Sequence, residues 1–73
     1  MPPLPVLSGD EFVRAMQRIG YRKERTVGSH MILAHLTRST LSVPRHPELG
    51  RGLLRRLVRD ADLTVDELVS LLK

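Results

Sequence analysis

The chain has 73 residues, 41% of them hydrophobic, which is enough for one domain with a modest core and too little for two domains. It contains no cysteine, so disulfides, thiolate zinc sites and thiol nucleophiles are excluded. The formal net charge of +4 is unevenly spread, because eleven basic and two acidic residues between positions 14 and 59 give that segment a balance of +9.

Residues 1–7 are expected to form an extended N-terminal leader, and residues 8–73 a single domain. The leader lacks the basic start and the long apolar stretch of a signal peptide, and no run in the chain is long enough to span a membrane. The absence of cysteine suits a reducing compartment, so we expect a cytoplasmic protein that does not act on membranes.

The first predicted helix begins at Ser8, which is paired with Glu11 in a Ser-x-x-Glu capping box. Its apolar residues recur at helical spacing: Phe12, Val13, Met16 and Ile19. Gly20 is a natural end for this helix, because glycine tolerates the left-handed conformation that follows many helices.

Three strands are expected next, arranged as an antiparallel meander. They cover residues 21–27, 30–36 and 40–43, and Pro44 ends the third. Gly28 and Ser29 supply the first turn, and residues 37–39 the second. Glycine at position 28 is also expected to let the backbone pass close to a bulky partner.

Two further helices complete the prediction. The second runs from about residue 53 to residue 61, and the third begins with a capping box formed by Thr64 and Glu67. Arg51, Arg55 and Arg59 are spaced i, i+4, i+8 on the side of the second helix away from its apolar stripe. The predicted order is therefore α-β-β-β-α-α, an α+β fold with a three-stranded antiparallel sheet.

The basic segment favours a polyanion as partner. Most of its charges are arginines, whose planar guanidinium groups match the oxygens of a phosphate. Two other interpretations stay open: a merely solvated arginine-rich surface, and a surface that faces an acidic protein. Phe12 and Tyr21 are the two aromatic residues, so no base-stacking platform is expected, and a nucleic acid would be held mainly by phosphates, shape or 2′-hydroxyls.

Histidine is the residue type through which this chain could perform acid–base chemistry, since imidazole titrates near neutrality. His30 follows the Gly-Ser turn, but a single histidine in a small domain is more often structural or exposed than catalytic. His35 is expected to hydrogen-bond a neighbouring loop, and the sequence does not place the loop residue His46 near His30. The three spacings lack the pattern of a metal site, and no phosphate-binding loop occurs, so neither a metal nor a cofactor is expected.

One class of reaction fits a histidine that is surrounded by arginines. RNA cleavage needs a base for the 2′-hydroxyl, an acid for the departing 5′-oxygen, and cations that stabilise the charged phosphorane. A histidine among arginines could supply all of them without a metal. DNA lacks the 2′-hydroxyl and could not be cut by this route.

From Ser8 to Leu72 the chain resembles the HicA toxin family of type II toxin–antitoxin modules. The segments that carry the resemblance are Ile19-Gly20-Tyr21, Gly28-Ser29-His30, Val43-Pro44-Arg45-His46, residues 52–57 and residues 61–68. The resemblance implies a double-stranded-RNA-binding-domain-like (dsRBD-like) α-β-β-β-α fold with an additional C-terminal helix. It also implies an mRNA-cleaving endoribonuclease of the stress response, neutralised by a HicB-type antitoxin, with His30 as the catalytic histidine.

Further site residues are chosen by type and position. Five residues are predicted to bind RNA or its phosphates: Lys23, Arg25, Ser29, Arg45 and His46. Of these, Ser29 would supply a small polar contact, and His46 is also a candidate for a second proton-transfer group. Two alternatives to the enzyme remain: a non-catalytic RNA-binding module of the same fold, and an adaptor that docks a protein through its apolar strand.

Overall fold

The computed structural model describes residues 3–73 and has the predicted order of elements. Its helices and strands, in chain order, are α1 (Gly9–Gln17), β1 (Arg22–Val27), β2 (His30–Ala34), β3 (Leu41–Pro44), α2 (Arg51–Asp60) and α3 (Val65–Leu71). The strands form one antiparallel sheet in the order β1-β2-β3. This arrangement confirms the predicted α+β fold, with the dsRBD-like order α-β-β-β-α and a further C-terminal helix.

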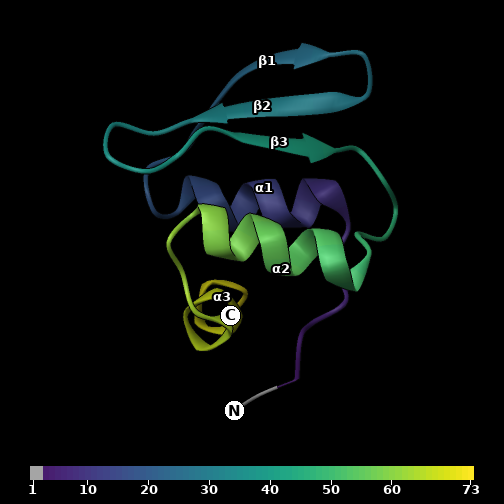
Figure 1. Cartoon of the computed structure of the whole chain (residues 1–73), viewed down its shortest axis with the longest axis vertical. Coiled ribbons are helices and arrows are strands. Elements are labelled where there is room, and N and C mark those ends of the chain that lie inside the picture. The colour runs from purple at the N-terminus through teal and green to yellow at the C-terminus, as the bar shows by residue number, and fades with distance from the viewer. Residues whose placement is uncertain (1–2) are drawn as a thin grey trace.

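The sheet and the helices form separate layers, with α1 and α2 beneath the sheet and α3 beyond them (Figure 1). On β2 and β3 the side chains that face the helices are almost fully buried: Met31, Leu33, Leu41 and Val43. Alternation along a strand turns the next side chains to the opposite, outer face of the sheet, where His30 and Ser42 are exposed. All six residues of β1 are exposed as well.

The predicted leader lies partly outside the described residues, which exclude Met1 and Pro2. Residues 3–7 belong to no helix or strand, but Leu4 packs against the core and Leu7 is buried within it. The Leu7 carbonyl also accepts a hydrogen bond from the Leu49 N–H at 2.7 Å. This part of the leader is therefore attached to the folded chain.

Both predicted capping boxes are present, at the starts of α1 and α3. The chain leaves α1 and α2 through residues with positive φ, Gly20 at +99° and Asp62 at +60°. After each of them, backbone N–H groups return to carbonyls of the last helical turn, which is the Schellman arrangement. Gly20 therefore has the terminating role that the sequence predicts for it.

Two arginines of the basic segment are bound to helix ends. The Arg38 guanidinium donates to the carbonyl oxygens of Ala61 and Asp62, at 2.6 and 3.1 Å. Arg18 donates to two carbonyl oxygens at the end of α3, those of Leu71 and Lys73, both at 2.8 Å. Since a helix C-terminus carries partial negative charge, these contacts stabilise the fold and occupy both guanidinium groups.

The connection between β2 and β3 differs from the prediction. The second strand ends at Ala34 rather than at residue 36, the third begins at Leu41, and the expected turn at 37–39 is part of a longer connection over residues 35–40. His35 organises it: Nδ1 accepts from the Thr37 and Arg38 N–H groups at 3.0 and 3.2 Å. Its Nε2–H donates to the Ile19 carbonyl at 2.8 Å, so the expected loop contact of His35 is confirmed.

Candidate functional site

His30 is placed by the turn that precedes it. Gly28 has a φ of +60°, a conformation that glycine adopts without strain. A Cβ atom at Gly28 would meet nothing within 4 Å, so the glycine serves the turn itself, and no close approach within the chain requires it. His30 pairs with Val27 on β1 and with Pro44 on β3, and its side chain is exposed on the outer face of the sheet.

Backbone hydrogen bonds fasten the loop after β3 to this turn and to the start of α1. The Arg45 N–H donates to the Ser29 carbonyl at 2.7 Å, and the Gly9 N–H donates to the His46 carbonyl at 3.0 Å. Gly9 stands so close to β3 that a Cβ atom there would overlap the carbonyl oxygen of Pro44. The first residue of α1 thus holds the segment that carries His46, and the Arg45 N–H joins this segment to the turn that precedes His30.

A groove of about 470 Å³ runs along the edge of the sheet at β3, beside α2, and both His30 and His46 line it. The sheet side also contributes the hydroxyl-bearing residues Thr40 and Ser42 and the apolar residues Leu41 and Pro44. The helix side contributes Leu53, Arg56, Leu57 and Asp60. The structure therefore answers the question that the sequence leaves open, because it brings the two histidines to one cavity.

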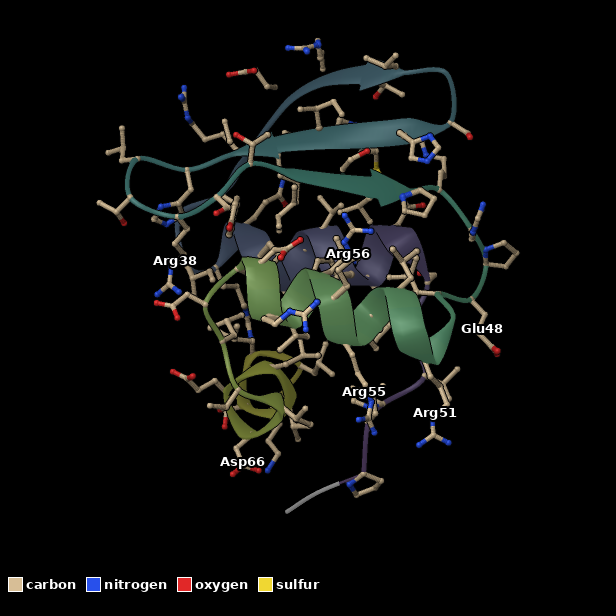
Figure 2. The ribbon with its side chains drawn as sticks, in the orientation of Figure 1. Arg38, Glu48, Arg51, Arg55, Arg56 and Asp66 are labelled. Atoms are coloured by element: carbon tan, nitrogen blue, oxygen red, sulfur yellow. The ribbon has the colours of Figure 1, made fainter. Side chains whose placement is uncertain are left out.

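Arg56 and Asp60 line the groove but are not among the site residues predicted from the sequence. With Leu53 and Leu57 these residues are spaced i, i+3, i+4, i+7, which places all four on one side of α2. Figure 2 shows Arg56 reaching toward the sheet, while Arg51 and Arg55 extend away from it. This spacing can be read from the sequence. The prediction for this helix considered only its apolar residues and the arginines on the opposite side.

Arg56 and Asp60 form a loose ion pair across one turn of α2. The Arg56 Nε atom lies 3.9 Å from Asp60 Oδ2, and 73% of the Arg56 side chain and 44% of the Asp60 side chain are exposed. A pair at this distance in water is weak, so the guanidinium keeps most of its hydrogen-bonding capacity. The groove thus offers two imidazoles, two hydroxyls, one guanidinium and the carboxylate of Asp60.

The other predicted phosphate contacts do not line the groove. Arg45 stands in the sequence between the groove residues Pro44 and His46, but its Nε is 3.6 Å from a carboxylate oxygen of Asp10. Lys23 and Arg25 belong to β1, on the far side of β2 from β3. Arg25 pairs with Ile32 and so shares the outer face with His30, whereas Lys23 pairs with Leu33 on the helix-facing side. Ser29 contributes the carbonyl that accepts from Arg45.

Within residues 3–73, no three histidine or carboxylate side chains gather as a metal-binding cluster. None of the helices in the same range is long and apolar enough to cross a membrane. The imidazoles and the guanidinium that line the groove can transfer protons and hold an anion.

The family of this chain follows from comparison with known proteins. A family model described as the HicA toxin of bacterial toxin–antitoxin systems matches residues 9–63, a range that spans α1, the sheet, α2 and the turn after it. No curated protein was found to match the chain. Since the matched range covers well over half of the 73 residues, this chain belongs to the HicA toxin family.

Proposed function

We propose that this toxin is an endoribonuclease that cleaves mRNA by metal-free acid–base catalysis, with His30 and His46 as its proton-transfer pair. The observation that carries the proposal is the shared groove, which both histidines line although they are sixteen positions apart in the chain. Membership of a toxin family supports the biological role. Two imidazoles in one cavity can supply a base and an acid in the same step, as RNA cleavage requires.

In this mechanism one imidazole accepts the proton of a ribose 2′-hydroxyl while the 2′-oxygen attacks the adjacent phosphorus. The bond from phosphorus to the 5′-oxygen of the next nucleotide breaks, and the second imidazole donates a proton to that oxygen. The products are a 2′,3′-cyclic phosphate and a free 5′-hydroxyl. This reaction needs no oxidant, metal or cofactor.

The other predicted site residues are not among those that line the groove. Arg25 on the outer face and Arg45 beside the His46 loop are proposed to contact the RNA on either side of the cleaved bond, together with Lys23 and Ser29. A HicB-type antitoxin is proposed to neutralise the toxin, and release from it during stress to arrest growth. The match to a toxin–antitoxin family supports an antitoxin as partner.

The test compares wild-type protein with His30→Ala and His46→Ala on a mixed-sequence RNA in buffer containing EDTA. Loss of a general acid or base is expected to lower the cleavage rate by about 10²- to 10⁴-fold. The wild-type rate should pass through a maximum with pH, and each variant should lose one side of that profile. The same oligonucleotide made of DNA is the substrate control and should stay intact.

Two outcomes would contradict the proposal. If wild type and His30→Ala bind RNA equally and neither cleaves it, the chain is an RNA-binding module without catalysis. If cleavage survives His46→Ala at the wild-type rate, His46 is not the second group. In cells, induced wild type should arrest growth and His30→Ala should not, and co-expression of a HicB-type antitoxin should restore growth.

A further inference from the structure

We propose that Arg56 is the phosphate-binding residue of the groove and that Asp60 competes with the phosphate for it. The ligand class is a phosphodiester of an RNA chain, and the inference rests on the proposed function in placing the scissile phosphate in this groove. Residues 52–57 belong to the segments that carry the family resemblance, but neither the resemblance nor the family match assigns a role to Arg56. Arg56 comes to notice only through its position in the folded chain.

Other arginines of the chain are bound elsewhere or lie away from the groove. Arg18 and Arg38 donate to helix-end carbonyls, and Arg45 is not among the residues that line the groove. Arg51 and Arg55 point away from the sheet on the other side of α2 (Figure 2). Among the described residues, 3–73, Arg56 is the one arginine or lysine that lines the groove with the histidines.

The present partner of Arg56 is easily replaced. The distance of 3.9 Å to Asp60 exceeds that of a charge-assisted hydrogen bond, about 2.7–2.9 Å, and both side chains are substantially exposed. A phosphate could accept two parallel N–H bonds from the guanidinium, a geometry that the single long contact to Asp60 does not provide. Exchange of the carboxylate for a phosphate is therefore expected to be favourable.

The position of Arg56 also suits the reaction. It belongs to the helix wall of the groove, whereas His30 and His46 belong to the sheet side. A phosphate bound by Arg56 would lie between that wall and the imidazoles, with the hydroxyls of Thr40 and Ser42 on the same side as the histidines. A guanidinium placed there would neutralise the charge that builds on the phosphorane during attack.

The chain offers a matched control, because Arg55 is the neighbour of Arg56 and its side chain leaves α2 in another direction. Arg55→Gln and Arg56→Gln remove the same charge from the same helix. The probe is a 2′-O-methyl RNA trinucleotide, which has no free 2′-hydroxyl and cannot be cleaved, and its affinity is measured by NMR titration. Arg56→Gln is expected to weaken binding by about tenfold, as for loss of a charged hydrogen-bonding group.

Arg55→Gln should leave the affinity within about twofold, since salt screens a charge that faces away from the ligand. Arg56→Lys should retain part of the affinity, because it keeps the charge but not the paired donors. Asp60→Asn should strengthen binding, because it removes the competing carboxylate. This opposite sign separates a ligand role from a structural one, since loss of structure would weaken binding in both cases.

Equal losses for Arg55→Gln and Arg56→Gln would overturn the inference, as would failure of the wild-type protein to bind the trinucleotide. Unfolding free energies, measured alongside, should match for the two variants because both side chains are exposed. The binding comparison does not depend on catalysis. If wild type binds the trinucleotide but does not cleave ordinary RNA, the proposed function fails. The affinities of the Arg55 and Arg56 variants still decide whether Arg56 binds the phosphate.

Discussion

His35 and His30 show how the same side chain serves structure in one place and is left free in another. The His35 ring bonds to three backbone groups and lies edge-on to Tyr21, with ring centroids 4.8 Å apart. The Tyr21 hydroxyl donates to the Ser39 carbonyl at 2.8 Å, and burial raises the pKa of its phenol, so this donor stays protonated. His30 has no hydrogen bond to another described residue through its side chain and remains accessible.

Substitution of His35 should therefore affect stability rather than catalysis. His35→Ala leaves the Thr37 and Arg38 N–H groups and the Ile19 carbonyl without their partner, and we expect a loss of about 2 kcal/mol in the free energy of unfolding. Urea denaturation measures this loss, and the cleavage rate per folded molecule should be unchanged. His30→Ala should give the reverse pattern. An unaltered unfolding curve for His35→Ala would show that these bonds contribute nothing net.

At the scale of the element, the two capping boxes show what local sequence determines. Ser8 and Glu11 exchange backbone-to-side-chain hydrogen bonds at 2.9 and 3.1 Å, and Thr64 and Glu67 repeat the same two distances at α3. All partners lie three residues apart, so the sequence contains the whole motif. The β2–β3 connection depends instead on a bond from His35 to Ile19, sixteen residues away, and the strand ends there were predicted less well.

The capping box of α1 predicts a dependence of stability on pH. Hydrogen bonds from the Ser8 backbone and then its side chain, with a smaller effect of Arg14, hold the pKa of the Glu11 carboxyl below its ordinary value of 4.5. Because the folded pKa is the lower one, the carboxylate stabilises the fold fully above pH 4.5, and this contribution is lost as the pH falls through the folded pKa.

Comparison with Glu11→Gln isolates this contribution, since glutamine keeps an acceptor oxygen but has no charge. The wild type should be the more stable protein near neutral pH, and the difference in unfolding free energy should shrink on acidification below pH 4.5. Chemical denaturation at several pH values measures the difference. Glu48→Gln, on the exposed loop before α2, controls for the removal of a carboxylate elsewhere. A difference that does not change with pH would contradict the assignment.

At the scale of the whole molecule, the groove is made by segments that the sequence does not connect. His30 follows the first turn of the sheet, His46 lies beyond β3, and Arg56 belongs to α2. The resemblance to the family indicated His30, because its signal is a short contiguous motif. The proximity of His46 and Arg56 follows from strand register and from the packing of α2 beside β3, which no local pattern specifies.

Gly9 connects this assembly to the core. Its N–H bonds the carbonyl of His46, and its missing side chain lets the start of α1 approach the Pro44 carbonyl. In Gly9→Ala the added methyl group has to displace either α1 or the loop that carries His46, at a cost of about 1–3 kcal/mol for an overpacked site. We therefore expect lower stability together with a lower rate of RNA cleavage.

Gly52→Ala is the matched control for Gly9→Ala, since a Cβ atom at Gly52 would meet nothing within 4 Å in the first turn of α2. That variant should gain up to about 1 kcal/mol, because alanine favours the helix, and it should cleave RNA at the wild-type rate. Denaturation curves and cleavage rates on the same preparations test both variants. If Gly9→Ala retained wild-type stability and activity, the approach of α1 to Pro44 would not control the position of His46, and the second histidine would be placed by its own loop alone.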